Sequence, residues 1–193
     1  MVTPTLVTDR LDTPILIGGM TWREFKATEQ LLARPGVRLS FLDGVLEIRQ
    51  MPGRQHETIK GRIGALIEAH LETIGLDFVP TESLTLESET GLVKREADKS
   101  YELGANKERP DLAIEVVVTS GGIDKLTAYQ RLQIAEVWFW EKGELSLYAL
   151  GDAGYIKIDQ SQVLPRLDIQ LLIRCINLPN HLQAIKEFRQ FDR

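Results

Sequence analysis

The segment that most constrains the fold is the run DLAIEVVV, residues 111–118. It is almost continuously apolar, which is typical of a β-strand that is covered on both faces. Such a strand requires a sheet with further layers around it. Because the rest of the chain shows both helical and strand patterns, we expect a mixed α/β or α+β domain with one sheet, a long helix early and a shorter one late.

Helical signals occur at both ends of the chain. Residues 21–24, Thr-Trp-Arg-Glu, match a capping box, which predicts a helix that runs to about Ala33. Over residues 56–75 the apolar side chains fall on one helical stripe, and Gly75 is a plausible stop. Residues 123–135 and 180–191 also have helical patterns.

Strand signals fill most of the remaining chain. Alternating residues around Asp43-Gly44 predict a hairpin in the segment 37–51, and a second hairpin is expected at 136–150. Shorter strand-like pieces are 76–80, 83–88, 96–102 and 155–158. Residues 1–20 have weak periodicity, so we interpret them as a loosely attached arm that precedes a single domain over residues 21–193.

Composition excludes several classes of protein. The chain has 193 residues, which fits one domain, and no apolar stretch reaches the roughly 18 residues of a membrane span. The N-terminus lacks the pattern of a signal peptide, so we expect a cytoplasmic protein without a membrane partner. A net charge of 23 − 28 = −5 argues against bulk attraction to nucleic acid, although residues 49–62 carry 4 − 1 = +3. The single Cys175 lies in an apolar setting and is expected to be buried, which excludes a cysteine zinc site.

Glu115 is the anomaly in the apolar run 111–118. A buried carboxylate without a partner is costly, so it is protonated, paired or bound to a metal. An ion pair with Arg109 or with a lysine is one solution, and a metal ligand or catalytic acid is the other. Asp111 shares the strand face but lies roughly 13 Å away along the strand, which is too far to bind one ion together with Glu115. We therefore interpret Asp111 as a residue that starts or caps the strand.

Asp98 is better placed to join Glu115. It precedes Glu115 by 17 residues (98 against 115), a spacing that suits two adjacent strands joined by the polar loop 104–110. Lys125 is expected in the first turn of the next helix, with Tyr129 on the same helix face. Two carboxylates that hold Mg²⁺, with a lysine that positions water or stabilises developing charge, are the minimum set for metal-assisted phosphodiester hydrolysis.

The chain also resembles a known family in the order of these residues. It is similar to the Uma-two family of endonucleases, which belongs to the PD-(D/E)XK nuclease superfamily and is abundant in cyanobacteria, in EADKSYEL and in the segment 109–150. Upstream segments TWREF and FLDGVLEIRQMPGRQHE agree, so the resemblance covers roughly residues 20–175. It implies a restriction-endonuclease-like mixed sheet flanked by helices, and an endonuclease that uses Mg²⁺ or Mn²⁺ and acts on DNA.

The resemblance also implies roles for individual residues. Asp98 matches the first metal-binding acid and Glu115 the second. The superfamily lysine normally lies two residues after the second acid, where this chain has Val117; in the family the lysine is on the following helix, where Lys125 lies. The proline of the first motif is replaced by Ala97.

Further candidates surround the start of the long helix. His56 is predicted to contact phosphate, and Glu57 is either an additional acid of the metal shell or a capping residue in the first helical turn. The predicted substrate-binding residues are His56, Arg54, Lys60, Arg62 and Tyr129.

The alternative function is a catalytically inactive module on the same fold, which binds nucleic acid or mediates dimerisation. In the dimerisation version, the segment EVWFWE and the C-terminal helix form the interface. Trp138 and Trp140 lie on one strand face and indicate core or interface packing rather than base stacking. A homodimer would also suit a nuclease, because cutting both strands of a duplex needs two active sites in a two-fold relation.

Overall fold

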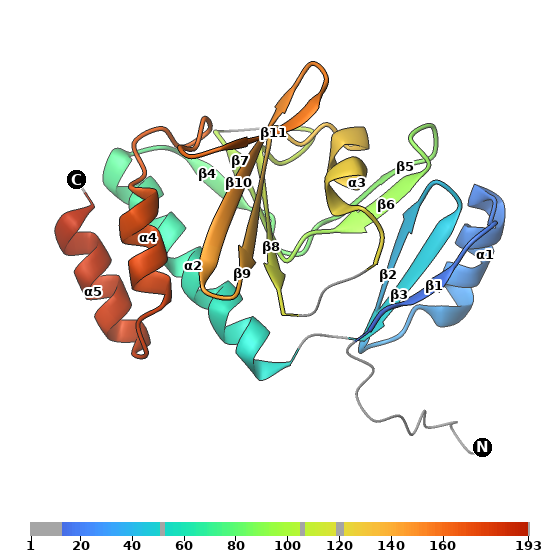
Figure 1. Ribbon diagram of the computed structural model, residues 1–193, viewed down its shortest axis with the longest axis horizontal. Coiled ribbons are helices and arrows are strands. Elements are labelled where there is room, and N and C mark those ends of the chain that lie inside the picture. Colours follow the sequence, from blue (N-terminus) through green and yellow to red (C-terminus); the bar gives the residue numbers. More distant parts are fainter. Residues whose placement is uncertain (1–12, 51–52, 105–106, 119–121, 193) are drawn as a thin grey trace.

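The computed structural model describes residues 13–50, 53–104, 107–118 and 122–192, and it shows two sheets where the sequence predicted one (Figure 1). The smaller sheet has the order β1-β3-β2-β6-β5, formed by Ile15–Ile17, Val45–Gln50, Val37–Leu42, Val93–Glu96 and Thr85–Ser88. The larger sheet has the order β11-β10-β9-β8-β7-β4, formed by Gly154–Ile158, Glu144–Gly151, Glu136–Glu141, Leu112–Val117, Lys99–Leu103 and Phe78–Pro80. The fold is therefore a mixed α+β architecture, as expected.

The chain passes from one sheet to the other at Ala97 and Asp98. The segment 96–102, expected as one strand, is instead the end of β6, which pairs with β2, and the start of β7, which pairs with β8. The pattern of apolar and polar residues does not reveal this change of sheet. β6 buries alternate side chains and β7 buries successive ones, and neither pattern shows which strand lies beside it. The crossing places Asp98 between the two sheets.

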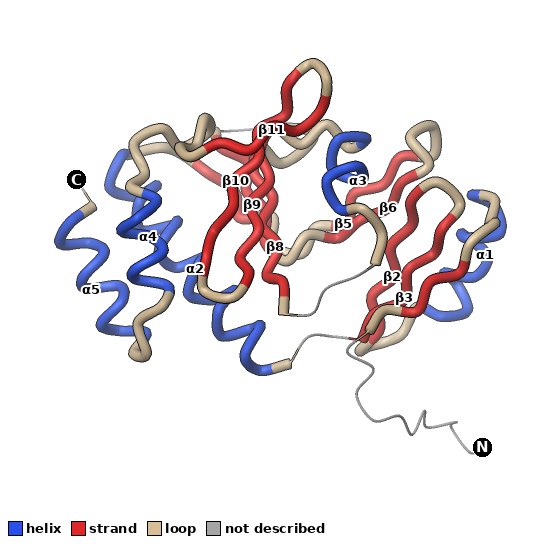
Figure 2. The backbone as a smooth tube through the Cα atoms, in the orientation of Figure 1, coloured by secondary structure: helices blue, strands red, loops and turns tan. Residues whose placement is uncertain are grey.

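Helices cover both faces of the larger sheet. On one side lie α2 (Arg54–Ile74), α4 (Ile169–Ile176) and α5 (His181–Phe191), and α3 (Lys125–Arg131) lies on the other side, between the two sheets (Figure 2). β8 therefore has helices on both of its faces, as its apolar sequence predicted. α1 (Trp22–Leu32) packs against the smaller sheet.

Local signals set the bounds of these elements. The Thr21 capping box is formed in full, since the side chains of Thr21 and Glu24 each accept from the other's backbone N–H. The first hairpin turns through Asp43 and Gly44 with φ values of 47° and 83°, as an Asp-Gly turn requires. α2 ends at Gly75, whose φ of 66° is left-handed.

Two expectations about the ends of the chain need revision. Residues 15–17, which were assigned to the loose arm, form an edge strand that pairs with β3. The segment LLIRCINL lies mostly in α4, a helix that was not predicted. Its buried residues follow a helical pattern, but the helix has only eight residues, so the pattern extends over about two turns. The sequence Thr-Ser-Gly-Gly at residues 119–122 predicts a loop after the apolar run, and residues 119–121 of it lie outside the described residues.

The main core lies between the larger sheet and the helices α2, α4 and α5. Trp138 and Trp140 are buried in it, which confirms the prediction of packing, and Cys175 is buried there as well. A second cluster lies under α3, and a third joins α1 to the smaller sheet. Within the described residues, no helix combines the length and the apolar character that crossing a membrane would require.

Candidate active site

Asp98 and Glu115 lie on neighbouring chain segments, as their spacing predicted. β7 and β8 are antiparallel, with Lys99 opposite Ile114, so continuing the register by one residue places Asp98 opposite Glu115. Both side chains are almost fully buried, with exposures of 3% and 1%. Two carboxylates therefore lie on neighbouring chain segments inside the protein.

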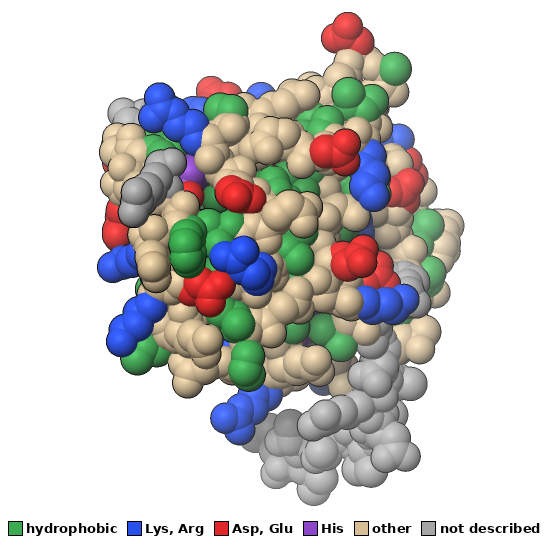
Figure 3. Space-filling model, turned by 60° about the vertical axis from the view of Figure 1, so that its left-hand side comes forward, with side chains coloured by type: hydrophobic (Ala, Val, Ile, Leu, Met, Phe, Trp, Pro, Cys, Tyr) green, Lys and Arg blue, Asp and Glu red, His purple; other side chains and the backbone are tan. Residues whose placement is uncertain are grey.

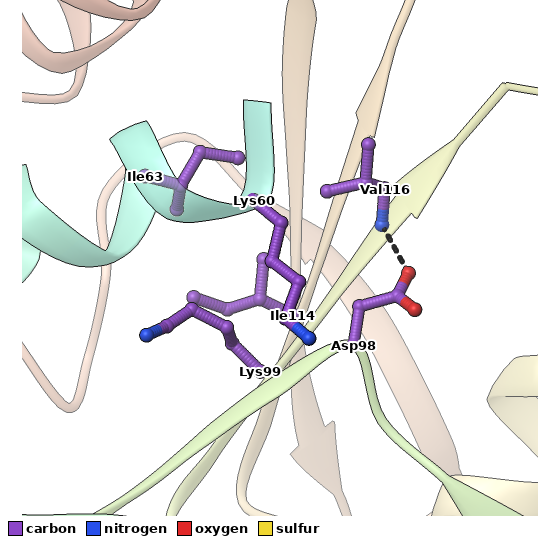
Figure 4. A pocket seen from close by; sticks show the side chains of 6 residues that line it. All are labelled: Lys60, Ile63, Asp98, Lys99, Ile114 and Val116. Carbon is purple, nitrogen blue, oxygen red and sulfur yellow. Dashed lines mark hydrogen bonds between the residues drawn. The ribbon is translucent and has the colours of Figure 1, made fainter. Parts of the chain in front are cut away.

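The Asp98 carboxylate is held by three donors. Its Oδ1 accepts from Arg38 Nη1 at 2.6 Å, and its Oδ2 accepts from His56 Nε2 at 3.0 Å. Oδ2 also accepts from the Val116 backbone N–H at 2.8 Å, the contact drawn in Figure 4. Burial by itself would raise the pKa of Asp98, but His56 and Arg38 outweigh it and lower that pKa strongly. Asp98 is therefore ionised at neutral pH.

His56 forms a bridge between two acids. Its Nδ1 lies 3.1 Å from Glu57 Oε1, while its Nε2 contacts Asp98. Burial disfavours the imidazolium, yet the hydrogen bonds and charges of Asp98 and Glu57 raise the pKa of His56 overall. Both ring nitrogens can donate only in the imidazolium form, so the raised pKa agrees with this geometry. His56 thus supports Asp98, and its predicted contact with phosphate stays a prediction.

Glu115 is compensated by three side chains. The guanidinium of Arg95 binds both carboxylate oxygens at 2.8 and 3.0 Å, and the Lys125 ammonium lies 2.7 Å from Oε2. The Tyr129 hydroxyl donates to Oε1 at 2.6 Å. Burial would raise the pKa of Glu115, but Arg95 and Lys125 lower it on balance, while burial and Glu115 raise the pKa of Tyr129. Glu115 therefore stays ionised and Tyr129 stays a donor.

These contacts decide between the partners proposed for Glu115. The lysine is confirmed as a partner in the form of Lys125, and Arg109 was wrong, because Arg109 donates to the backbone carbonyl of Leu132. Asp111 accepts from the Leu103 N–H at 2.7 Å and from Lys107, so it fixes the loop before β8, as a strand-start residue does.

A third buried acid, Glu47 of β3, was missed. It is 1% exposed, and its Oε1 lies 3.3 Å from Arg95 Nη1 and 2.9 Å from Arg49 Nε. Its Oε2 accepts from the Ile123 N–H at 2.9 Å. Gly122 has a φ of +107°, and a side chain there would overlap the Glu47 carboxylate, so the segment before α3 lies directly on this acid. No spacing rule links Glu47 to Glu115, since they belong to different sheets.

Arg95 and Arg38 were missed for a related reason. Both lie on strands of the smaller sheet and reach the acids of the larger one. In the sequence Arg95 reads as one charge in a mixed run, and Arg38 as the polar position of an alternating hairpin. In β6, Arg95 lies on the same buried strand face as Val93. This two-residue spacing from an apolar residue is the one sequence signal that distinguishes Arg95 from a surface charge.

The remaining residues predicted to bind substrate differ in their exposure and in their contacts. Arg54 is exposed at the start of α2, and Lys60 is half-buried, donates to Ser83 Oγ at 3.2 Å and lines a narrow pocket with Asp98 (Figure 4). Arg62 is buried and donates to the carbonyls of Ile176, Leu178 and Pro179 at the end of α4. Arg62 is therefore a helix-capping residue and not a phosphate contact. Tyr129 is fully buried against Glu115 and is likewise not a surface for substrate.

Asp98 and Glu115 fit a Mg²⁺ site in their donor chemistry. Both present ionised oxygens, which Mg²⁺ prefers, and Asp98 Oδ1 accepts one hydrogen bond where a carboxylate oxygen can accept about two. Both oxygens of Glu115 are engaged by Arg95, Lys125 and Tyr129, so a metal would replace one of these donors. In the described part of the chain, no group of three or more His, Cys, Asp or Glu side chains is arranged to hold a metal. The predicted additional acid, Glu57, contacts His56.

The face that carries α4 and α5 has no comparable feature. Figure 3 turns this side forward, and the acidic and basic side chains of its described residues are interspersed, with no large field of one sign. An open groove along α5 is lined by a mixture of neutral polar, charged and apolar residues, of which Leu182 and Phe191 are exposed. The buried charges at Asp98 and Glu115 therefore remain the strongest candidate for a functional site.

Comparisons with known proteins agree with this fold. The model of the Uma2 (Uma-two) family, described as "Putative restriction endonuclease", matches residues 22–179. A solved structure described as "a putative nuclease belonging to DUF820 from Anabaena variabilis ATCC 29413" superposes with a TM-score of 0.53 at 15% sequence identity, covering 88% of this chain and 99% of that one. At this identity the likeness shows the fold alone. No curated protein matches the chain.

Proposed function

This chain belongs to the Uma2 family of restriction-endonuclease-like proteins, and on that premise we propose that it is a Mg²⁺-dependent endonuclease that hydrolyses phosphodiester bonds of DNA at Asp98 and Glu115. One observation carries the proposal: two ionised, buried carboxylates lie on neighbouring chain segments, Asp98 directly before β7 and Glu115 in β8, with the Lys125 ammonium 2.7 Å from Glu115. This combination provides ligands for a cation and a positive charge for a phosphate at one place.

Each residue has a role that follows from its contacts. Asp98 and Glu115 would hold the metal, which when bound polarises the scissile phosphate and lowers the pKa of a water. Lys125 is the partner of Glu115 that reaches the surface, with 18% of its side chain exposed, so it is placed to stabilise charge that develops on the phosphate. Arg38 and His56 fix the Asp98 carboxylate, and they are positioning residues.

DNA would approach over the start of α2. Arg54 is exposed in the first turn of this helix, and Lys60 lies six residues further along, in the lining of the Asp98 pocket. The helix begins at Gly53 without a side-chain cap, so its first N–H groups are free of a capping side chain. Helix N-termini and lysine or arginine side chains both favour phosphate groups.

The direct test is cleavage of plasmid DNA in Mg²⁺ by variants of the two acids. Asp98→Asn and Glu115→Gln are expected to lose Mg²⁺-dependent cleavage, while circular dichroism checks that they fold. Glu141→Gln is the matched control, because Glu141 is an exposed carboxylate at the end of the neighbouring strand β9. Unchanged cleavage by either acid variant would refute the assignment.

The inactive binding module is the alternative, and one observation favours it: protein cations already occupy both oxygens of Glu115, Arg95 on Oε1 and Arg95 with Lys125 on Oε2. Such a module would bind DNA with a strong dependence on salt and would not cleave it. The same plasmid assay separates the two functions when it is combined with a binding measurement. Light scattering would test the proposed homodimer.

A further inference from the structure

Arg95 is shared between two acids that belong to different sheets. Its Nε and Nη2 bind Glu115 of β8, while its Nη1 lies 3.3 Å from Glu47 of β3. The guanidinium is 3% exposed, so it has no access to water as a substitute partner. A buried guanidinium needs an acid in every state of the protein, because leaving it unpaired is strongly destabilising.

Glu115 has no acceptor site left for a further ligand. Two oxygens offer about four lone-pair positions, and they receive contacts from Arg95, Lys125 and Tyr129. A cation that binds Glu115 must therefore displace one of these donors. Of the two charged donors, Arg95 already touches a second acid, whereas the described contacts of Lys125 are Glu115 and the ring of Phe139 at 5.9 Å.

Glu47 binds Arg49 and the Ile123 N–H and already accepts one contact from the Arg95 guanidinium, so Arg95 needs no new acceptor position to shift toward it. Its contact with Arg95 is long, 3.3 Å, compared with 2.8 Å for the shortest contact between Arg95 and Glu115. Shortening this contact would keep Arg95 paired without exposing it. The Ser40 hydroxyl lies 3.4 Å from the same Nη1 and offers a second acceptor there.

We propose that Arg95 is a positioning residue that neutralises Glu115 in the metal-free protein and moves onto Glu47 when the metal binds. This inference rests on the proposed metal site at Asp98 and Glu115. Arg95 thereby competes with the metal, and Glu47 favours the metal-bound state by accepting Arg95. Metal affinity is then set by Glu47 and Arg95 as well as by the metal ligands.

The test measures Mn²⁺ affinity by titration calorimetry on the full chain without DNA. Arg95→Met removes the competing cation at similar length and should tighten Mn²⁺ binding about tenfold, within the usual range of coupling between two ligands. Glu47→Gln removes the acceptor and should weaken Mn²⁺ binding by a similar factor. Arg174→Met, which breaks an exposed pair with Glu187 between α4 and α5, is the control and should leave the affinity unchanged.

A double variant separates displacement from a general change in charge. If Arg95 acts through Glu47, then Glu47→Gln has little further effect in the Arg95→Met background, whereas independent charge effects would add. Additive effects, or an unchanged affinity in Arg95→Met, would overturn the inference. If Arg95→Met does not fold, Glu47→Gln decides alone: weaker binding supports the inference, and equal or tighter binding overturns it.

The outcomes also distinguish this inference from the proposed function. Mn²⁺ binding by wild type with no response to Arg95→Met leaves the metal site intact and removes only the role of Arg95. Binding in Arg95→Met but not in wild type supports competition by the guanidinium. Binding in neither protein overturns both the metal site and the competition.

Discussion

Glu115 keeps its charge inside a β-strand because Arg95, Lys125 and Tyr129 replace the water that it loses. The contribution of the Tyr129 hydroxyl is measurable on its own, since it is a neutral donor to a buried anion. Tyr129→Phe should lower the free energy of unfolding by about 2 kcal/mol, the typical value for a hydrogen bond to a charged group. Urea denaturation measures this change.

Tyr155→Phe is the matched control for that substitution. The Tyr155 hydroxyl donates to the backbone carbonyl of Ile134, a neutral acceptor, so its loss should cost about 1 kcal/mol. An equal or larger loss in Tyr155→Phe would show that Glu115 does not depend on Tyr129 for its charge.

Lys125 tests the proposed chemistry at the scale of one side chain. Lys125→Met should reduce DNA cleavage about 100-fold or more, because a preorganised positive group near a developing charge has an effect of that size. Mn²⁺ binding should persist, since the metal ligands are unchanged. Lys142→Met, at an 88% exposed site, should cleave as wild type does, and a normal rate for Lys125→Met would remove Lys125 from the catalytic set.

Contacts of the candidate residues were predictable where the two partners are close in sequence or on neighbouring strands of one sheet, and were not predictable where the partners come from different sheets. The contact between Lys125 and Glu115 was predictable, because a strand and the helix that follows it are close in sequence. The placement of Asp98 and Glu115 on neighbouring chain segments was predictable from the length of the loop between them. Arg95 and Glu47 reach Glu115 from the other sheet, and their positions depend on how two sheets pack, for which a single sequence offers no periodicity.

At the scale of elements, α2 combines a predictable face with an unpredictable one. Its apolar stripe was read correctly, and Ile63, Leu66, Ile67 and Leu71 are buried against the larger sheet. Arg62 was predicted to bind substrate, but α4 and α5 pack against α2, and the guanidinium binds the carbonyls of residues 176, 178 and 179 at and after the end of α4. Helix periodicity shows which residues are apolar, but it does not show which polar positions a later helix will cover.

The contacts of Arg62 with backbone carbonyls lead to a prediction that differs from the one expected of a substrate-binding residue. Arg62→Met should destabilise the fold by about 2 kcal/mol, because it leaves buried carbonyls without a charged donor. The dependence of DNA affinity on salt should not change, since no phosphate contact is lost. Urea denaturation and binding at several salt concentrations measure the two quantities.

Arg54, at the exposed start of the same helix, should behave in the opposite way. Arg54→Met should leave the free energy of unfolding nearly unchanged and reduce the slope of log affinity against log salt by about one, the effect of one lost phosphate contact. If Arg62→Met changes the slope and Arg54→Met does not, the two assignments are reversed.

At the scale of the whole molecule, buried ion pairs connect the two sheets. Arg95 of the smaller sheet binds both Glu47 of its own sheet and Glu115 of the larger one, and Arg38 of β2 binds Asp98. The apolar cluster under α3 also joins the sheets, because Leu42 and Val93 of the smaller sheet pack in it together with Ala113 and Val137 of the larger one. Because buried ion pairs lose much of their value when one partner is exposed, neither sheet can open without destabilising the other.

The two sheets are therefore expected to unfold as one cooperative unit, and the three tryptophans allow a direct test. Trp22 packs with Phe25 and Phe41 on the smaller sheet, whereas Trp138 and Trp140 are in the core of the larger one. In a variant with both Trp138→Phe and Trp140→Phe, the fluorescence of Trp22 should change at the same urea concentration as the far-ultraviolet circular dichroism of the whole chain. In Trp22→Phe, fluorescence reports on the larger sheet and should again coincide with circular dichroism. A separate, earlier transition of Trp22 would mean that the smaller sheet unfolds on its own, and that Arg38, Glu47 and Arg95 can leave Asp98 and Glu115 without unfolding the rest.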